Sequence, residues 1–140
     1  MWFIVHVLFT IGLIKVFNIT TNYEIMLAFI FGVLVDIDHL IRLPEYIRKN
    51  GWHVVHHWHF RTSIQEPFSY IWVIPLCILL DSWVPFVFFT GHLILDYVMS
   101  YEKTPLWPIS RLSFDVHSHR KDWIAQLVAS AISVALMIIA

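Results

Sequence analysis

The stretch Val84–Tyr101, VPFVFFTGHLILDYVMSY, is an apolar segment with two ionisable side chains in its second half, His92 and Asp96. Its apolar residues form a long run without polar alternation, which is typical of a membrane helix. Residues four apart share one face of a helix, so the imidazole and the carboxylate can reach the same ion. Gly91, just before this pair, allows another backbone to approach closely. The stretch therefore predicts a membrane helix that contributes ligands to a shared site.

Four further apolar segments accompany this one, and hydrophobic residues make up 59% of the chain against 14% charged residues. A soluble domain usually carries about a quarter charged residues. We therefore expect one all-α domain over residues 1–140, a multi-pass transmembrane bundle of about five helices. The third segment holds only about 14 residues and contains Pro75, so it is short for a span of ~20 residues. The expected helical segments are Trp2–Phe17, Tyr23–Ile41, Pro67–Leu80, Val84–Tyr101 and Trp123–Ala140.

The basic residues predict how the bundle is oriented. Eight of the nine Lys and Arg residues lie in the loops 42–66 and 102–122, and only Lys15 lies elsewhere. The excess of positive charge in cytoplasmic loops then places both loops and the N-terminus on the cytoplasmic side of the inner membrane. No basic stripe interleaved with aromatic residues is present, so we expect no nucleic-acid partner. The candidate site residues fall at the same membrane face, which makes it the expected place of a metal site.

Those candidate residues are acidic and imidazole groups, which rarely stay in a membrane without a partner or a role, since insertion there costs about 2.5–3.5 kcal/mol. Cys77 is the only cysteine, so a thiolate zinc site is excluded. Oxygen and imidazole ligands suit Zn²⁺ first, with Mn²⁺ or Fe²⁺ as alternatives. There are more candidates than one tetrahedral ion needs, which favours more than one ion. The expected metal ligands are His6, Asp36, Asp38, His39, His56, His57, His59, His92 and Asp96.

Each candidate also has a plainer interpretation. His6 alone could be a satisfied core histidine, and helix-to-helix ion pairs could explain the Asp and His residues of the apolar segments. His117 and His119 could belong to a solvated loop. Arg61 suits bidentate contact with phosphate, or it is a loop charge. Glu66 is a candidate general base or ligand, but with Pro67 it also fits a helix start that has Pro at its first position.

Several of these motifs resemble one known family. The segment Gly32–His39, GVLVDIDH, resembles the G-x-L-x-P-D-x-D-H motif of the YdjM-like (DUF457) membrane-bound metal-dependent hydrolases, with Val35 where the family has Pro. Gly91–Asp96, GHLILD, is similar to its later His-x-x-x-Asp segment. The family's central H-R-x-x-T-H-S segment is replaced by His56–Ser63, HHWHFRTS, which keeps the His content but not the spacing. The resemblance implies a helical multi-pass hydrolase with a catalytic divalent metal, and a more distant similarity to zinc-dependent phospholipase C.

Three functions compete on this evidence. The leading one is a hydrolase at the cytoplasmic face, acting on phosphoesters of lipid or lipid-linked substrates. The second is a metal-free lipid phosphatase, which also uses an H-x-x-x-D element, but the chain lacks the K-x6-R-P and P-S-G-H elements of that group. The third is a non-catalytic metal-binding membrane scaffold or carrier. A transporter is expected to hold its ligands near the bilayer midplane, and here they gather at one face.

Overall fold

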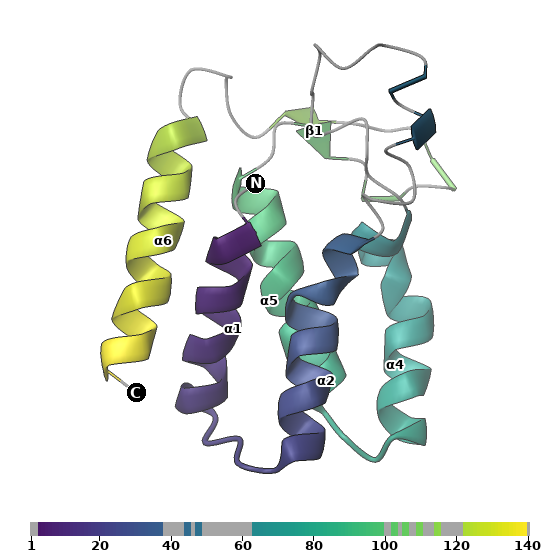
Figure 1. The fold of residues 1–140 in the computed structure, drawn as a ribbon. Coiled ribbons are helices and arrows are strands. Elements are labelled where there is room, and N and C mark those ends of the chain that lie inside the picture. The colour runs from purple at the N-terminus through teal and green to yellow at the C-terminus, as the bar shows by residue number, and fades with distance from the viewer. Residues whose placement is uncertain are drawn as a thin grey trace.

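The computed structural model describes residues 3–37, 44–45, 47–48, 63–99, 102–103, 105–106, 109–110, 114–115 and 122–139. In this part of the chain five α-helices stand side by side as a bundle (Figure 1), which confirms the expected all-α fold. The α-helices are α1 (Phe3–Val16), α2 (Asn22–Gly32), α4 (Tyr70–Leu79), α5 (Val84–Met99) and α6 (Asp122–Ile139). Shorter elements are the 3-10 helices η1 (Leu34–Asp36), η3 (Ser63–Gln65) and η4 (Pro67–Ser69), and the strands β1 (Glu102–Lys103) and β2 (Phe114–Asp115).

The helices alternate in direction along the chain, so α1, α4 and α6 begin at the end of the bundle where α2 and α5 finish (Figure 1). The two connections rich in Lys and Arg, after α2 and after α5, therefore start and finish at one end of the bundle. Strands β1 and β2 pair antiparallel, with Glu102 opposite Asp115. This arrangement agrees with the shared placement of the two loops that the basic residues predict.

Polar residues set the turns at the opposite end. Thr21 caps α2: its hydroxyl accepts a hydrogen bond from the Glu24 backbone N–H and donates one to the Glu24 carboxylate. Asn18 and Asp81 adopt φ values of 50° and 49°, a left-handed conformation that these two residue types tolerate better than most. The breaks that the sequence predicts after Phe17 and after Leu80 are thereby confirmed.

The main core lies between α2, α4 and α5, and helix α1 covers it from the other side. Phe88 and Phe89 of α5 are fully buried there against Phe31 of α2 and Val73 of α4. Burying one such aromatic side chain contributes about 1.5–3 kcal/mol. Helix α6 packs mainly against α1, where a Cβ on Gly12 would come within 2.8 Å of the Leu136 Cβ atom. Close packing of α1 between α6 and the core fixes the position of its N-terminal turn.

The segment Tyr23–Ile41, expected as one helix, is interrupted. Helix α2 ends at Gly32, Val33 leaves helical geometry with φ −132° and ψ −53°, and η1 follows. Because the residues on both sides of this break are apolar, the hydrophobic pattern of the sequence does not indicate it. Similarly, α4 covers only the part of Pro67–Leu80 that follows η4, with Pro67 at the start of η4 as expected for a first-turn proline.

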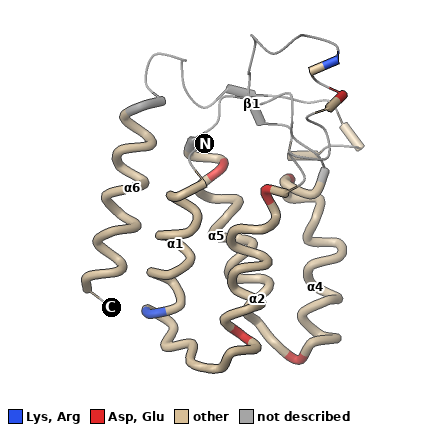
Figure 2. The backbone as a smooth tube through the Cα atoms, viewed as in Figure 1, with Lys and Arg blue, Asp and Glu red and all other residues tan. Residues whose placement is uncertain are grey.

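The outer faces of the helices carry many exposed apolar side chains, such as Ile78 (78% exposed) and Ile139 (85% exposed). Charged residues of the described helices lie toward the two ends of the bundle (Figure 2). In the described ranges, no helix combines the length and the apolarity that crossing a bilayer requires.

Candidate metal centre

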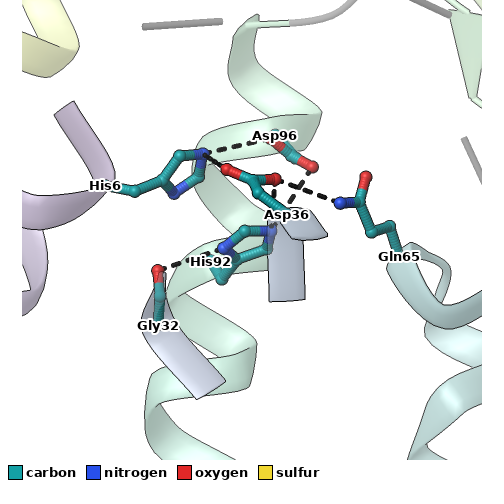
Figure 3. Close-up of polar contacts among 6 residues, drawn as sticks. All are labelled: His6, Gly32, Asp36, Gln65, His92 and Asp96. Carbon is teal, nitrogen blue, oxygen red and sulfur yellow. Dashed lines mark hydrogen bonds and ion pairs between the residues drawn. The ribbon is translucent and has the colours of Figure 1, made fainter. Parts of the chain in front are cut away.

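Four predicted ligands meet at the loop end of the bundle: His6 of α1, Asp36 of η1, and His92 and Asp96 of α5 (Figure 3). One candidate ligand atom from each lies within 4.8 Å of the corresponding atom of every other. Both imidazoles are fully buried, and the side chains of Asp36 and Asp96 are 16% and 8% exposed. Residues separated by up to 90 positions in the sequence thus form one compact cluster.

Helix α1 brings His6 to the cluster through a close contact with α2. His6 and Thr10 are four residues apart and share one face of α1, and Thr10 packs directly against Gly32 at the end of α2. A Cβ on Gly32 would collide with the Thr10 hydroxyl and would also come within 3.4 Å of the Phe88 ring. A glycine at this position therefore allows the approach that carries His6 into the site.

The break between α2 and η1 places Asp36. In a continued α-helix the Asp36 N–H would bond to the Gly32 carbonyl, but it donates instead to the Val33 carbonyl at 3.2 Å. The tighter 3-10 turn then directs the Asp36 side chain toward α5, where it meets His92. The same break leaves the Gly32 carbonyl available for a side-chain donor.

That donor is His92, whose Nδ1 lies 3.1 Å from the Gly32 carbonyl oxygen. A carbonyl oxygen only accepts hydrogen bonds, so the proton is on Nδ1, and in the neutral ring Nε2 carries a lone pair. His92 Nε2 is buried, has no hydrogen-bond partner among the described residues, and faces both carboxylates. A histidine that donates one ring N–H to a backbone carbonyl while its other nitrogen faces a site is the usual arrangement of a metal-ligating imidazole.

The distances between the imidazoles and the carboxylates suit ligands that share an ion. Four nitrogen–oxygen distances join the imidazole Nε2 atoms to the carboxylates: His6–Asp36 3.6 Å, His6–Asp96 3.4 Å, His92–Asp36 3.4 Å and His92–Asp96 3.7 Å. Hydrogen bonds of this type are about 2.7–3.2 Å long, so all four distances exceed that range. Two ligands bound tetrahedrally at about 2.0–2.2 Å lie roughly 3.3–3.6 Å apart, which is close to the observed values.

Each carboxylate directs a different oxygen at each imidazole. Asp36 turns Oδ2 toward His6 and Oδ1 toward His92, while Asp96 turns Oδ1 toward His6 and Oδ2 toward His92. The two rings are stacked, with centroids 4.2 Å apart and planes inclined by 21°. Both carboxylates therefore span the two imidazoles, as bridging ligands do.

Two further side chains border the cluster from the segment η3–η4. Gln65 is fully buried, and its side-chain amide donates a hydrogen bond of 3.0 Å to Asp36 Oδ1. The adjacent Glu66 is also buried and accepts a 2.7 Å hydrogen bond from the hydroxyl of Tyr97, the neighbour of Asp96. Glu66 thus bonds to the residue that follows Asp96, and it is not one of the four clustered ligands.

Asp38, His39, His56, His57, His59 and Arg61 lie outside the described residues. Of the ligand set, the structure brings together His6, Asp36, His92 and Asp96.

Sequence reasoning missed two groups that complete the centre, the Gly32 carbonyl and the Gln65 amide. The Gly32 carbonyl is a backbone group and becomes available only through the interruption of α2. Gln65 lies 29 residues from Asp36, and it directly precedes the Glu66–Pro67 pair that also fits a helix start. The one available signal was a polar side chain adjoining an apolar segment.

Comparisons with known proteins give no match for this chain. No protein-family model matches the chain, and neither the curated proteins nor the solved structures give a significant match.

Proposed function

We propose that this protein is a membrane-bound metal-dependent hydrolase that acts on phosphoesters of lipid or lipid-linked substrates at the cytoplasmic face. The observation that carries the metal part is the tautomer of His92, which turns a buried nitrogen lone pair toward two carboxylates. An interposed cation is the simplest group that satisfies a lone pair and two carboxylate oxygens at these distances.

We propose further that the centre takes two divalent ions, with Zn²⁺ as the leading candidate and Mn²⁺ or Fe²⁺ as alternatives. One ion would be held by His6 and one by His92, with Asp36 and Asp96 bridging both. This is supported by the different oxygen that each carboxylate presents to each ring. Imidazole and carboxylate ligands without thiolate suit these ions. Asp38, His39 and the residues His56, His57 and His59 remain our candidates for completing the coordination.

Paired divalent ions supply Lewis acidity and make water nucleophilic near neutral pH, which is the chemistry that phosphoester hydrolysis needs. Hydrolysis forms a P–O bond to the oxygen of water, breaks the P–O bond to the leaving alcohol, and transfers one proton to that alcohol. Glu66 is our candidate for taking this proton from water, because it is a buried carboxylate that bonds to Tyr97, the neighbour of Asp96. Arg61 is our candidate for holding the phosphate, since a guanidinium can bind two phosphate oxygens together.

The membrane part of the proposal is supported by the outer surface of the bundle. Helix α4 contains no charged residue, and α5 contains only Asp96, which belongs to the centre. Large apolar side chains project from the outer faces of three helices, whereas soluble proteins rarely expose extensive apolar patches. Examples are Ile71, Ile78 and Leu79 of α4, Ile94 and Val98 of α5, and Leu127, Ile138 and Ile139 of α6.

Hydrolysis assays on the full chain in detergent test the proposal. Protein loaded with Zn²⁺ or Mn²⁺ is incubated with bis(p-nitrophenyl) phosphate and with phosphatidylglycerol vesicles, beside an Asp96→Ala variant. We expect turnover that requires metal and is lost in the variant. Bound metal without turnover on any phosphoester would favour the metal-binding scaffold, and turnover that survives chelation would favour the metal-free phosphatase.

A further inference from the structure

We propose that Gln65 is a positioning residue of the metal centre: its side-chain amide orients Asp36 so that this carboxylate bridges the two imidazoles. The inference rests on the proposed metal binding and assigns to Gln65 a part of the resulting affinity. It adds a residue of η3 to a centre whose ligands come from α1, η1 and α5.

The contact itself is short and enclosed. The Gln65 Nε2 atom donates to Asp36 Oδ1 at 3.0 Å, and the Gln65 side chain has no exposed surface (Figure 3). The same Asp36 oxygen lies 3.4 Å from His92 Nε2. The Gln65 amide therefore holds the same Asp36 oxygen that faces His92.

The chemistry of an amide suits this role. An amide N–H is a neutral donor, so it occupies one lone pair of Oδ1 and leaves the negative charge of Asp36 for a cation. The hydrogen bond restricts rotation of the carboxylate about its last bond, so that Oδ2 continues to face His6. Hydrogen bonds to ligating groups of this kind typically change metal affinity by about 10–100-fold when they are removed.

The backbone on either side of Gln65 is itself fixed. The neighbouring Glu66 accepts a hydrogen bond from Tyr97 of α5, and the Ser69 N–H bonds to the Glu66 carbonyl at the start of η4. Gln65 is therefore presented to Asp36 from a segment attached to the helix that carries His92 and Asp96. This attachment explains how a residue between two short 3-10 helices can hold a ligand in place.

The experiment measures the affinity of the full-length protein for Zn²⁺ by competition with a chromophoric chelator, and the visible spectrum of the Co²⁺-loaded protein. Gln65→Met removes the amide and keeps the length of the side chain. Gln65→Asn keeps the amide but is one methylene shorter, and it serves as a second variant in case the first folds poorly. The matched control is Tyr70→Phe, which removes the 2.7 Å Tyr70–Thr90 hydrogen bond between α4 and α5 without touching Asp36.

We expect both Gln65 variants to bind Zn²⁺ about 10–100-fold more weakly and to alter the Co²⁺ spectrum, as loss of an oriented ligand requires. Tyr70→Phe should lower the unfolding temperature and keep wild-type affinity and spectrum. Affinity in both Gln65 variants within about threefold of wild type, or an equal loss in the control, would overturn the inference while leaving the metal centre intact. Absence of Zn²⁺ and Co²⁺ binding in the wild type would instead refute the proposed function itself, and this inference with it.

Discussion

Replacing Gly32 by alanine should damage the metal centre through packing alone. A Cβ at this position would collide with the Thr10 hydroxyl and would lie 3.3 Å from Thr10 Cγ2 and 3.4 Å from the Phe88 ring. Because the neighbours are side chains of two packed helices, α1 must move away from α2 or the Gly32 backbone must shift. Either movement separates His6 from the centre or lengthens the hydrogen bond from His92 Nδ1 to the Gly32 carbonyl.

The Gly32→Ala substitution should change two measurable quantities, the folding free energy and the metal affinity. Adding a methyl group to a well-packed core costs about 1–3 kcal/mol of folding free energy. Disturbing the hydrogen bond that orients His92 should weaken metal binding by about 10–100-fold, which corresponds to roughly 1.4–2.7 kcal/mol. Chemical unfolding of the metal-free protein in detergent measures the first quantity, and chelator competition measures the second.

A second variant tests the cause. Thr10→Ala removes the two closest atoms that the new methyl group would meet, so the double variant Gly32→Ala/Thr10→Ala should recover part of both losses. The four proteins form a double-mutant cycle whose coupling energy reports the contact. Wild-type stability and metal affinity in Gly32→Ala, or losses in the double variant that are the plain sum of the single ones, would refute this reasoning.

Three further predictions concern the ligands, the metal and the turn opposite the centre. Asp96→Ala should abolish bound metal and hydrolysis while the helix content measured by circular dichroism stays unchanged, and full activity in this variant would end the assignment. Chelation of the metal should destabilise the folded protein by about 2.7 kcal/mol for each bound ion, relative to free metal at 100 times its dissociation constant. An unfolding temperature that does not change with chelator would argue against a bound ion. Thr21→Ala should lower the free energy of unfolding by about 0.5–2 kcal/mol, because the Glu24 N–H loses its capping acceptor. Metal affinity should stay unchanged in this variant. Weakened metal binding would show that the two ends of the bundle are coupled.

Much of the fold follows from sequence because its signals are local. The i,i+4 spacing of His92 and Asp96 put both on one face of a helix, and the structure confirms that they meet in one cluster. The polar residues after Phe17 and after Leu80 marked turns that the structure also shows. The grouping of Lys and Arg in two connections predicted that these share one end of the bundle.

The details of the centre depended on contacts that no local pattern encodes. The interruption of α2 at Val33 lies within an apolar run, so hydrophobicity alone extends the helix through it. The amide of Gln65 reaches Asp36 across 29 residues, and its significance appears only when the two elements are packed together. The tautomer of His92 depends on a backbone carbonyl that the helix break releases.

Metal content is the measurement that tests the account most directly. Protein purified in detergent with zinc or manganese supplied and without chelator is analysed by inductively coupled plasma mass spectrometry, beside an Asp36→Ala/His92→Ala double variant. We expect two divalent ions per chain in the wild type and none in the variant. Wild-type protein without bound metal under these conditions would contradict this expectation, and the four side chains would then be a buried polar cluster that holds no ion.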